Sequence, residues 1–159
     1  MSRIFLILLL LPLGVQAIFD SKSEIVVQAH TVVVDGRSEL STYTGDAKIT
    51  QGDLLIMAQK IQVFNKEQVV SKIIATGVKK KPAYYKQNQP KQSGFVEATA
   101  QKITYFIDKQ LVRLEGNAHL TQDSNSFSGG LLNYDIKKNK IIAKKSKDGM
   151  QRVKFKIKL

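Results

Sequence analysis

Residues 112–121 read VRLEGNAHLT. Apolar or small side chains occupy every second position of this stretch, and polar side chains stand at most positions between them. Successive side chains of a β-strand point to opposite faces, so a period of two is typical of a strand with one buried face. A helix would need apolar residues at i, i+3 and i+4, which this stretch does not supply. It is therefore predicted to form a strand.

The same alternation runs through most of the chain and predicts an all-β fold. The other stretches that show it are 24–29, 43–51, 60–64, 102–107 and 152–159. Short polar sequences separate these stretches, which favours antiparallel hairpins between consecutive strands. The predicted turns are Asp35-Gly36, Asn65-Lys66-Glu67, Asp108-Lys109-Gln110 and Lys137-Lys138-Asn139. One longer polar stretch, residues 86–94, is expected to be a loop within the same domain.

An internal repeat is visible in the alternating stretches. The sequence GDAKITQ at 45–51 recurs as GNAHLTQ at 116–122, a shift of 71 residues. A glycine inside each predicted strand suggests a bulge or bend, where a flat ribbon must curve. Repeated hairpins that cannot bury one face alone must stack on their neighbours. The repeat therefore predicts a long, twisted, two-layered stack of sheets rather than a compact closed barrel.

The first residues have the composition of a secretory signal peptide. Arg3 supplies a positive start, residues 4–15 are almost wholly apolar, and Val15-Gln16-Ala17 offers small residues where a signal peptidase cleaves. The apolar run is too short for a membrane-spanning helix, which needs about 20 residues. We expect residues 1–17 to be a cleaved signal peptide and residues 18–159 to form one exported domain.

The chain is strongly basic, with 25 Lys and Arg against 13 Asp and Glu and a net charge of +12. The excess is greatest after residue 136, where lysines crowd the last predicted turn and the last predicted strand. Such a surface attracts polyanions. An exported protein rarely meets nucleic acid, so anionic lipid headgroups or phosphorylated glycolipid are the expected partners. A solvated basic face that only aids solubility is the alternative.

Signatures of catalysis and of cofactor binding are missing from the sequence. The chain has no cysteine, and its two histidines, His30 and His119, each stand alone in the chain. Neither a transition-metal site nor thiol chemistry is expected. No glycine-rich phosphate loop opens a helix, and nothing resembles a nucleophile elbow. We expect neither a cofactor nor enzymatic activity, although two carboxylates facing one cleft would support a glycan-active enzyme instead.

Four stretches together carry a resemblance to a known protein family. They read YTGDAKITQGD at 43–53, KPAYY at 81–85, ITY at 103–105 and VRLEGNAHLTQDSN at 112–125. They resemble the OstA-like family of periplasmic lipopolysaccharide-transport proteins, and the resemblance covers nearly all of the predicted exported domain. It implies a twisted, open half β-jellyroll of consecutive antiparallel strands.

The same resemblance implies a function and partners. A member of this family would be a periplasmic carrier that binds the lipid A part of lipopolysaccharide in a hydrophobic β groove. It would accept the lipid from an inner-membrane complex and pass it to an outer-membrane translocon. It would also join other copies head to tail, by strand pairing at its two ends.

The inner faces of the predicted sheets would shelter acyl chains, because each methylene left in water costs about 0.8 kcal/mol. The alternation predicts as groove residues Ile25, Val27, Ala47, Ile49, Ile56, Ile61, Val63, Tyr84, Tyr105, Val112, Leu114, Ala118, Leu120 and Tyr134. The same residues could instead pack only against one another as an ordinary core.

The first and last alternating stretches, 24–29 and 152–159, would be end strands with unpaired backbone edges that can accept a partner strand. The predicted partner-edge residues are Ile25, Val27, Val153, Phe155 and Ile157. Lysines on the last strand would either block nonspecific pairing or select an acidic partner edge.

Two other functions fit the same sequence. A membrane-anchored relative of the same pathway would keep its N-terminal helix, and the short apolar run with Val15-Gln16-Ala17 argues against it. A β-repeat scaffold that binds no lipid would show a dry, fully interdigitated interior.

Overall fold

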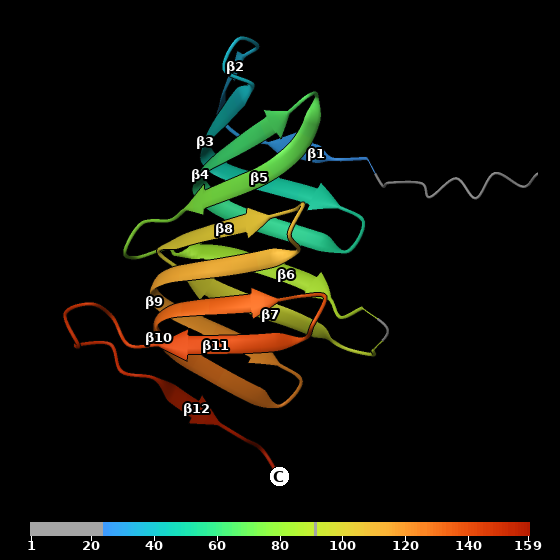
Figure 1. Ribbon diagram of the computed structural model, residues 1–159. Coiled ribbons are helices and arrows are strands. Elements are labelled where there is room, and N and C mark those ends of the chain that lie inside the picture. The colour runs from blue at the N-terminus through green and yellow to red at the C-terminus, as the bar shows by residue number, and fades with distance from the viewer. Residues whose placement is uncertain (1–23, 91) are drawn as a thin grey trace, which may run out of the picture.

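The computed structural model describes residues 24–90 and 92–159, which form twelve β-strands and no helix (Figure 1). The strands are β1 (Val26–Gln28), β2 (Thr31–Asp35), β3 (Leu40–Gln51), β4 (Leu54–Lys66), β5 (Val69–Thr76), β6 (Ala83–Asn88), β7 (Phe95–Ala100), β8 (Lys102–Phe106), β9 (Leu111–Gln122), β10 (Asn125–Asp135), β11 (Lys140–Lys144) and β12 (Lys154–Lys156). Neighbouring strands pair antiparallel. The predicted all-β, jellyroll-like fold of antiparallel strands is confirmed. The predicted signal peptide lies outside the described residues.

Four long strands run through both layers of the fold. One half of β3 pairs with β2 and the other half with β1. In the same way β4 pairs with β5 and β6, β9 with β8 and β7, and β10 with β11 and β12. One layer therefore contains β2, β5, β8 and β11, and the other contains β1, β6, β7 and β12. The long strands curve from one layer into the other (Figure 1).

The long strands bend at the glycines that the repeat singles out. The pairing of β3 with β4 is interrupted between Thr44 and Ala47, where Gly45 has a φ of +86°. Gly116 occupies the same place in β9, with a φ of +81°. A Cβ atom on Gly45 would lie 2.5 Å from Nδ1 of His30, so the space as well as the backbone requires glycine. The predicted bend within each strand is confirmed.

The shift of 71 residues seen in the sequence also relates the two halves of the structure. Ser41 faces Val63 across β3 and β4, and Val112 faces Tyr134 across β9 and β10, which is the same pair moved by the repeat. The halves are joined twice, by β5 against β8 in one layer and by β6 against β7 in the other. The result is the long two-layered stack that the repeat predicts.

The predicted loop at residues 86–94 is shorter in the structure. Lys86–Asn88 belong to β6, because they pair with β4 or with β7, and the loop begins at Gln89. The backbone N–H of Asn88 also donates to Oδ2 of Asp53, at 3.1 Å, which holds the end of the strand. The polar composition of residues 86–88 gave no sign that the strand continues through them.

Candidate functional site

The space between the two layers is filled by the inward-facing side chains of both repeats. Most of the predicted groove residues lie there with 8% or less of their surface exposed: Ala47, Ile49, Ile56, Ile61, Val63, Tyr105, Val112, Leu114, Ala118, Leu120 and Tyr134. They form one apolar cluster. Val27 packs against this cluster while remaining partly exposed. The alternation of the sequence therefore identifies a single interior.

Two predicted groove residues lie outside this interior. Ile25 is 36% exposed and precedes β1. Tyr84 points to the outer face of β6, where its hydroxyl donates to Oε1 of Glu97 at 3.0 Å. Partial burial and this carboxylate raise the pKa of Tyr84 to about 12. The neighbouring Tyr85, at 1% exposed, takes the inward position instead.

Tyr85 links the two layers inside the core. Its ring meets the ring of Tyr105 edge to face, with centroids 6.1 Å apart, and its hydroxyl donates to Oε1 of Gln87 at 2.7 Å. Tyr85 comes from β6 and Tyr105 from β8, so the pair spans both layers. Burial raises the pKa of both phenols, which therefore stay neutral.

The interior opens on one side of the first repeat. The hairpin turns of the two layers face each other on the right of Figure 1, along a line that we call the seam. A cavity of about 550 Å³ lies at the seam in the first repeat. It is lined by Glu24, Ile25, Gln51, Gln68, Val69, Val70 and Ile107. Its apolar walls come from both layers, and Val70 and Ile107 also pack against the core.

In the second repeat, polar side chains of the two layers meet across the seam, beside a cavity of about 390 Å³ that Gln89 and Asn139 help to line. Nε2 of Gln122, at the end of β9, donates to Oδ1 of Asn139 at 2.5 Å and to Oε1 of Gln89 at 3.0 Å. Nε2 of Gln89 in turn donates to Oδ1 of Asp123 at 2.9 Å. We call these four side chains the amide latch. The repeat places Gln51 and Gln68, which line the open cavity, at the positions of Gln122 and Asn139.

The amide latch was not predicted from the sequence. Its members end strands or lie in turns, where amides usually face solvent. One signal was present, because the repeat places glutamine at the same position, Gln51 and Gln122, in both halves.

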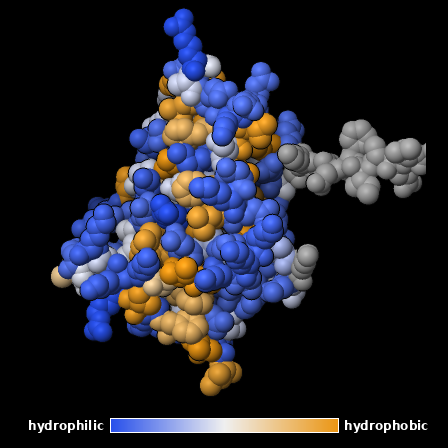
Figure 2. Space-filling view, in the orientation of Figure 1, coloured by the Kyte–Doolittle hydropathy of each residue, from blue (hydrophilic) through white to orange (hydrophobic). Residues whose placement is uncertain are grey.

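Both ends of the stack expose backbone edges and inward-facing apolar side chains. At the first end, β1 and β2 pair only with β3 among the described strands, and Val34 is 70% exposed. At the other end β11 and β12 pair only with β10, and Phe155 is 49% exposed although its ring stacks on Phe127 at 4.6 Å. Figure 2 shows apolar side chains gathered at the lower end of the molecule, below β12 in the orientation of Figure 1. The predicted edge residues Val153 and Ile157 are 47% and 59% exposed.

Among the described residues, no helix is long and apolar enough to cross a membrane. No group of three or more His, Asp or Glu side chains there is arranged to hold a metal ion.

Comparison with known proteins finds relatives from one transport system. Lipopolysaccharide export system protein LptH of Pseudomonas aeruginosa is 28% identical over 120 residues, which cover 75% of this chain and 67% of LptH. Lipopolysaccharide export system protein LptA of Escherichia coli K12 is 27% identical over 124 residues, covering 78% of this chain and 66% of LptA. The matched region therefore spans about two thirds of the length of these relatives.

A solved structure and a family model agree with these relatives. The crystal structure of LptH, the LptA homologous periplasmic component of the lipopolysaccharide transport device of Pseudomonas aeruginosa, superposes with a TM-score of 0.77. It is 24% identical and the superposition covers 86% of this chain and 96% of that one, which shows a shared fold. A family model described as LptA/(LptD N-terminal domain) LPS transport protein matches residues 26–140. Because this match covers most of the chain, the chain belongs to the family of LptA and LptD N-terminal-domain transport proteins.

Proposed function

We propose that the protein is a periplasmic carrier of lipopolysaccharide and not an enzyme. In this proposal the lipid A part lies between the two layers, and the carrier passes it from an inner-membrane complex to an outer-membrane translocon. Family membership and the names of the relatives support a role in lipopolysaccharide export. The observation that carries the proposal is the cavity at the seam, two of whose apolar lining residues, Val70 and Ile107, also pack against the core.

The closed part of the interior has to open for acyl chains to enter. Residues such as Ile49 and Leu114 are fully buried, so the layers must part before a chain can lie between them. Burial of each methylene contributes about 0.8 kcal/mol, so a long acyl chain supplies several kcal/mol toward that separation. The first repeat is the expected entry, because the cavity there lies between Ile25 and Gln51 of one layer and Val69 of the other. The amide latch keeps the second repeat closed until the lipid advances.

We also propose that copies of the chain, and the transport complexes at either membrane, join end to end by strand pairing. The junction inside the molecule, β5 with β8 and β6 with β7, is the template. By the repeat, β11 and β12 of one copy are equivalent to β5 and β6. In the next copy, β2 and β1 are equivalent to β8 and β7, so β11 would pair with β2 and β12 with β1. A second copy would therefore complete both layers and cover the exposed apolar ends.

The internal junction also predicts the register between copies. Ile73 faces Tyr105 across β5 and β8, and Tyr85 faces Ala98 across β6 and β7. Ile141 holds the place of Ile73, because Ile141 pairs with Tyr134 and Ile73 pairs with Val63, the equivalent of Tyr134 in the first repeat. Phe155 likewise holds the place of Tyr85, because Phe155 pairs with Phe127 and Tyr85 pairs with Ile56, the equivalent of Phe127. The expected contacts are then Ile141 with Val34 of the next copy, and Phe155 with Val27 of the next copy.

Photo-crosslinking in cells tests the carrier function. A photoreactive residue at Val69 or Ile107 lies at the proposed entry, whereas Lys48 and His119 on the outer face serve as controls. Adducts with lipopolysaccharide at the entry positions and not at the controls are expected. Equal labelling at all four positions, or labelling of none in folded protein, would favour a β-repeat scaffold that binds no lipid.

The exported form is also a proposal. We propose that residues 1–17 are removed and that the mature chain begins at Ile18. N-terminal sequencing of protein purified from the periplasm is expected to start at Ile18. An intact N-terminus in the membrane fraction would instead support the membrane-anchored relative of the pathway.

A further inference from the structure

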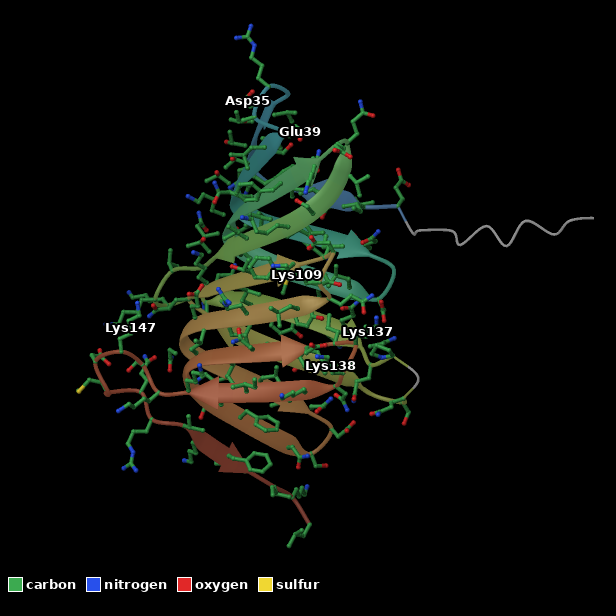
Figure 3. The ribbon with its side chains drawn as sticks, in the orientation of Figure 1. Asp35, Glu39, Lys109, Lys137, Lys138 and Lys147 are labelled. Atoms are coloured by element: carbon green, nitrogen blue, oxygen red, sulfur yellow. The ribbon has the colours of Figure 1, made fainter. Side chains whose placement is uncertain are left out.

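The connection between β11 and β12 forms a pocket rich in cations at the C-terminal end of the stack. The pocket has a volume of about 660 Å³ and is lined by Ala143, Lys144, Lys145, Ser146, Lys147, Arg152 and Val153. Lys147 projects from this connection, on the side of the molecule opposite Lys137 and Lys138 (Figure 3). The pocket therefore lies away from the seam, where the chain crosses from one layer to the other.

The cations of this pocket lack carboxylate partners. None of Lys144, Lys145, Lys147 and Arg152 takes part in an ion pair within the described part of the chain. The connection has one carboxylate, Asp148, which accepts hydrogen bonds from the hydroxyl of Ser146 and from the backbone N–H of Met150. The pocket thus has a net positive charge, which attracts an anion.

Comparison of the two repeats explains the unbalanced charge. In the first repeat the connection between β5 and β6 also has lysines, and Nζ of Lys81 lies 2.9 Å from Oδ1 of Asp46 in the bulge of β3. The repeat places Asn117 at the position of Asp46. Asn117 has no charge, and its backbone N–H donates to Oε1 of Gln151 at 2.8 Å. The second repeat therefore keeps the cations and loses the carboxylate that would neutralise them.

The pocket is held in shape by the backbone of the connection. The N–H of Ser146 donates to the carbonyl of Gln151 at 2.9 Å, and the N–H of Gln151 donates to Oγ of Ser146 at 3.0 Å. Gly130 lets the connection between β11 and β12 pack directly against β10, because a Cβ atom on Gly130 would clash with Cα of Ser146. A connection whose backbone is held in this way keeps its lysines near one another, so an anion binds with less loss of conformational entropy than on a mobile tail.

Two apolar residues of the pocket, Ala143 and Val153, lie beside the interior. Ala143 packs against the core cluster, and Val153 lies two residues before Phe155, whose ring stacks on Phe127. Val153 precedes β12, and its Cγ2 lies 3.6 Å from the place that a Cβ atom on the buried Gly129 would take, so Val153 borders the inward row. A ligand with an anionic head and an apolar tail fits this combination better than a free anion does.

We propose that this pocket binds the phosphate group of an amphiphile whose apolar tail enters the C-terminal end of the interior. The proposal rests on the carrier function proposed above and adds to it a binding site for the headgroup. Phosphate is the expected anion class because several cations can share its charge. An acidic strand edge of a second protein copy is the competing occupant, and the test below distinguishes the two.

The test compares two triple variants that remove the same charge. Lys145→Gln/Lys147→Gln/Arg152→Gln alters the pocket, and Lys66→Gln/Lys79→Gln/Lys80→Gln removes three exposed cations elsewhere. Isothermal titration calorimetry at low ionic strength measures binding of dodecyl phosphate, neutral dodecyl maltoside and inorganic phosphate, with both detergents below their critical micelle concentrations. Circular dichroism and urea unfolding confirm that both variants fold.

The pocket variant is expected to bind dodecyl phosphate on the order of tenfold more weakly than wild type, with dodecyl maltoside unaffected. The control variant should stay within about twofold of wild type, since its cations lie outside the pocket. Equal losses in both variants would overturn the proposal in favour of general charge attraction. Inorganic phosphate bound as tightly as dodecyl phosphate would overturn the role of the tail.

Two further outcomes separate this site from the carrier function. Unchanged dodecyl phosphate binding in the pocket variant, with weakened self-association in sedimentation velocity, would assign the cations to a second copy and overturn the proposal. If wild type bound dodecyl maltoside while the pocket variant lost no affinity for dodecyl phosphate, only the headgroup site would fail. If wild type bound neither detergent, the carrier function itself would fail with it.

Discussion

Gln122 and Asn139 join the two layers of the structure, with Nε2 of Gln122 donating to Oδ1 of Asn139 at 2.5 Å. Gln122 ends a strand of one layer and Asn139 lies in a turn of the other. Gln122 and Gln89 are only 9% and 5% exposed. A buried amide that loses its hydrogen-bond partner costs about 1–3 kcal/mol of folding free energy. The contact between Gln122 and Asn139 should therefore stabilise the fold and hold the two layers together.

Replacement of Gln122 by Met should open the amide latch with little change in side-chain volume. Gln89 and Asn139 would lose a buried partner, and we expect the free energy of unfolding to fall by about 1–3 kcal/mol in urea titrations. Hydrogen exchange in the turn at 136–139 should also become faster, because the turn loses its tie to the other layer. The exposed Gln28→Met is the control and should change stability by less than about 0.5 kcal/mol. Equal free energies of unfolding for the two variants would contradict a stabilising role of the amide latch.

The alternation of the sequence predicted the interior because the strands are long and one face is buried. Ile49 and Leu120 belong to such runs, and both are inward. The structure turns Tyr85 inward rather than the predicted Tyr84, and alternation could not choose between them because the two are adjacent and equally apolar. Lys86 shares the face of Tyr84 and was the available signal that this face is the outer one. Thr104 is 4% exposed although it alternates with Ile103 and Tyr105, so the outer face of β8 is also partly covered.

The seam and the cationic pocket could not be predicted in this way. Each depends on segments distant in the chain, such as Gln89 with Gln122, or Ala143 with Val153. Period two reports which face a residue occupies, but not which strand ends meet across the layers. The repeat came closer, since it relates Asp46 to Asn117, but their different partners appear only in the structure.

Substitution of the bulge glycines by alanine should destabilise both repeats. Gly45 and Gly116 have positive φ angles, and a Cβ atom on Gly116 would lie 3.0 Å from Cβ of Gln101. We expect Gly45→Ala and Gly116→Ala each to lower the free energy of unfolding by about 1–3 kcal/mol. Gly36→Ala, which has nothing within 4 Å, should leave it within about 0.5 kcal/mol of wild type. A loss at Gly36 as large as at Gly45 would show that the bulge is not the cause.

The pKa of Tyr84 should respond to Glu97. Partial burial, and then the Glu97 carboxylate, raise this pKa from 10.0 to about 12. A raised pKa in the folded state means that the neutral phenol stabilises the fold below pH 10, and that this contribution is lost as the pH rises toward 12. In Glu97→Gln the pKa should fall but stay above 10.0, because the partial burial remains. Carbon-13 NMR of labelled tyrosine resolves this titration from those of the core tyrosines, and an unchanged value would contradict the role of the carboxylate.

The proposed junction between copies can be tested by a disulfide, because the chain contains no cysteine of its own. The register expected from the internal junction places Phe155 of one copy opposite Val27 of the next, within the Cα separation of about 4.4–6.8 Å that a disulfide needs. Protein with both Phe155→Cys and Val27→Cys should form a ladder of oxidised oligomers on non-reducing gels, which collapses to monomer on reduction.

The control for this junction is a register slip. Phe155→Cys with Gln28→Cys moves one cysteine by a single residue and points its side chain to the opposite face, so crosslinking should be much weaker. Val27 lies in β1 and Phe155 in β12, at opposite ends of the stack, so a bond within one chain cannot mimic the ladder. Equal crosslinking of the two pairs would show that the ends associate without a fixed register. Absence of crosslinking in both would instead count against β12 as the joining edge.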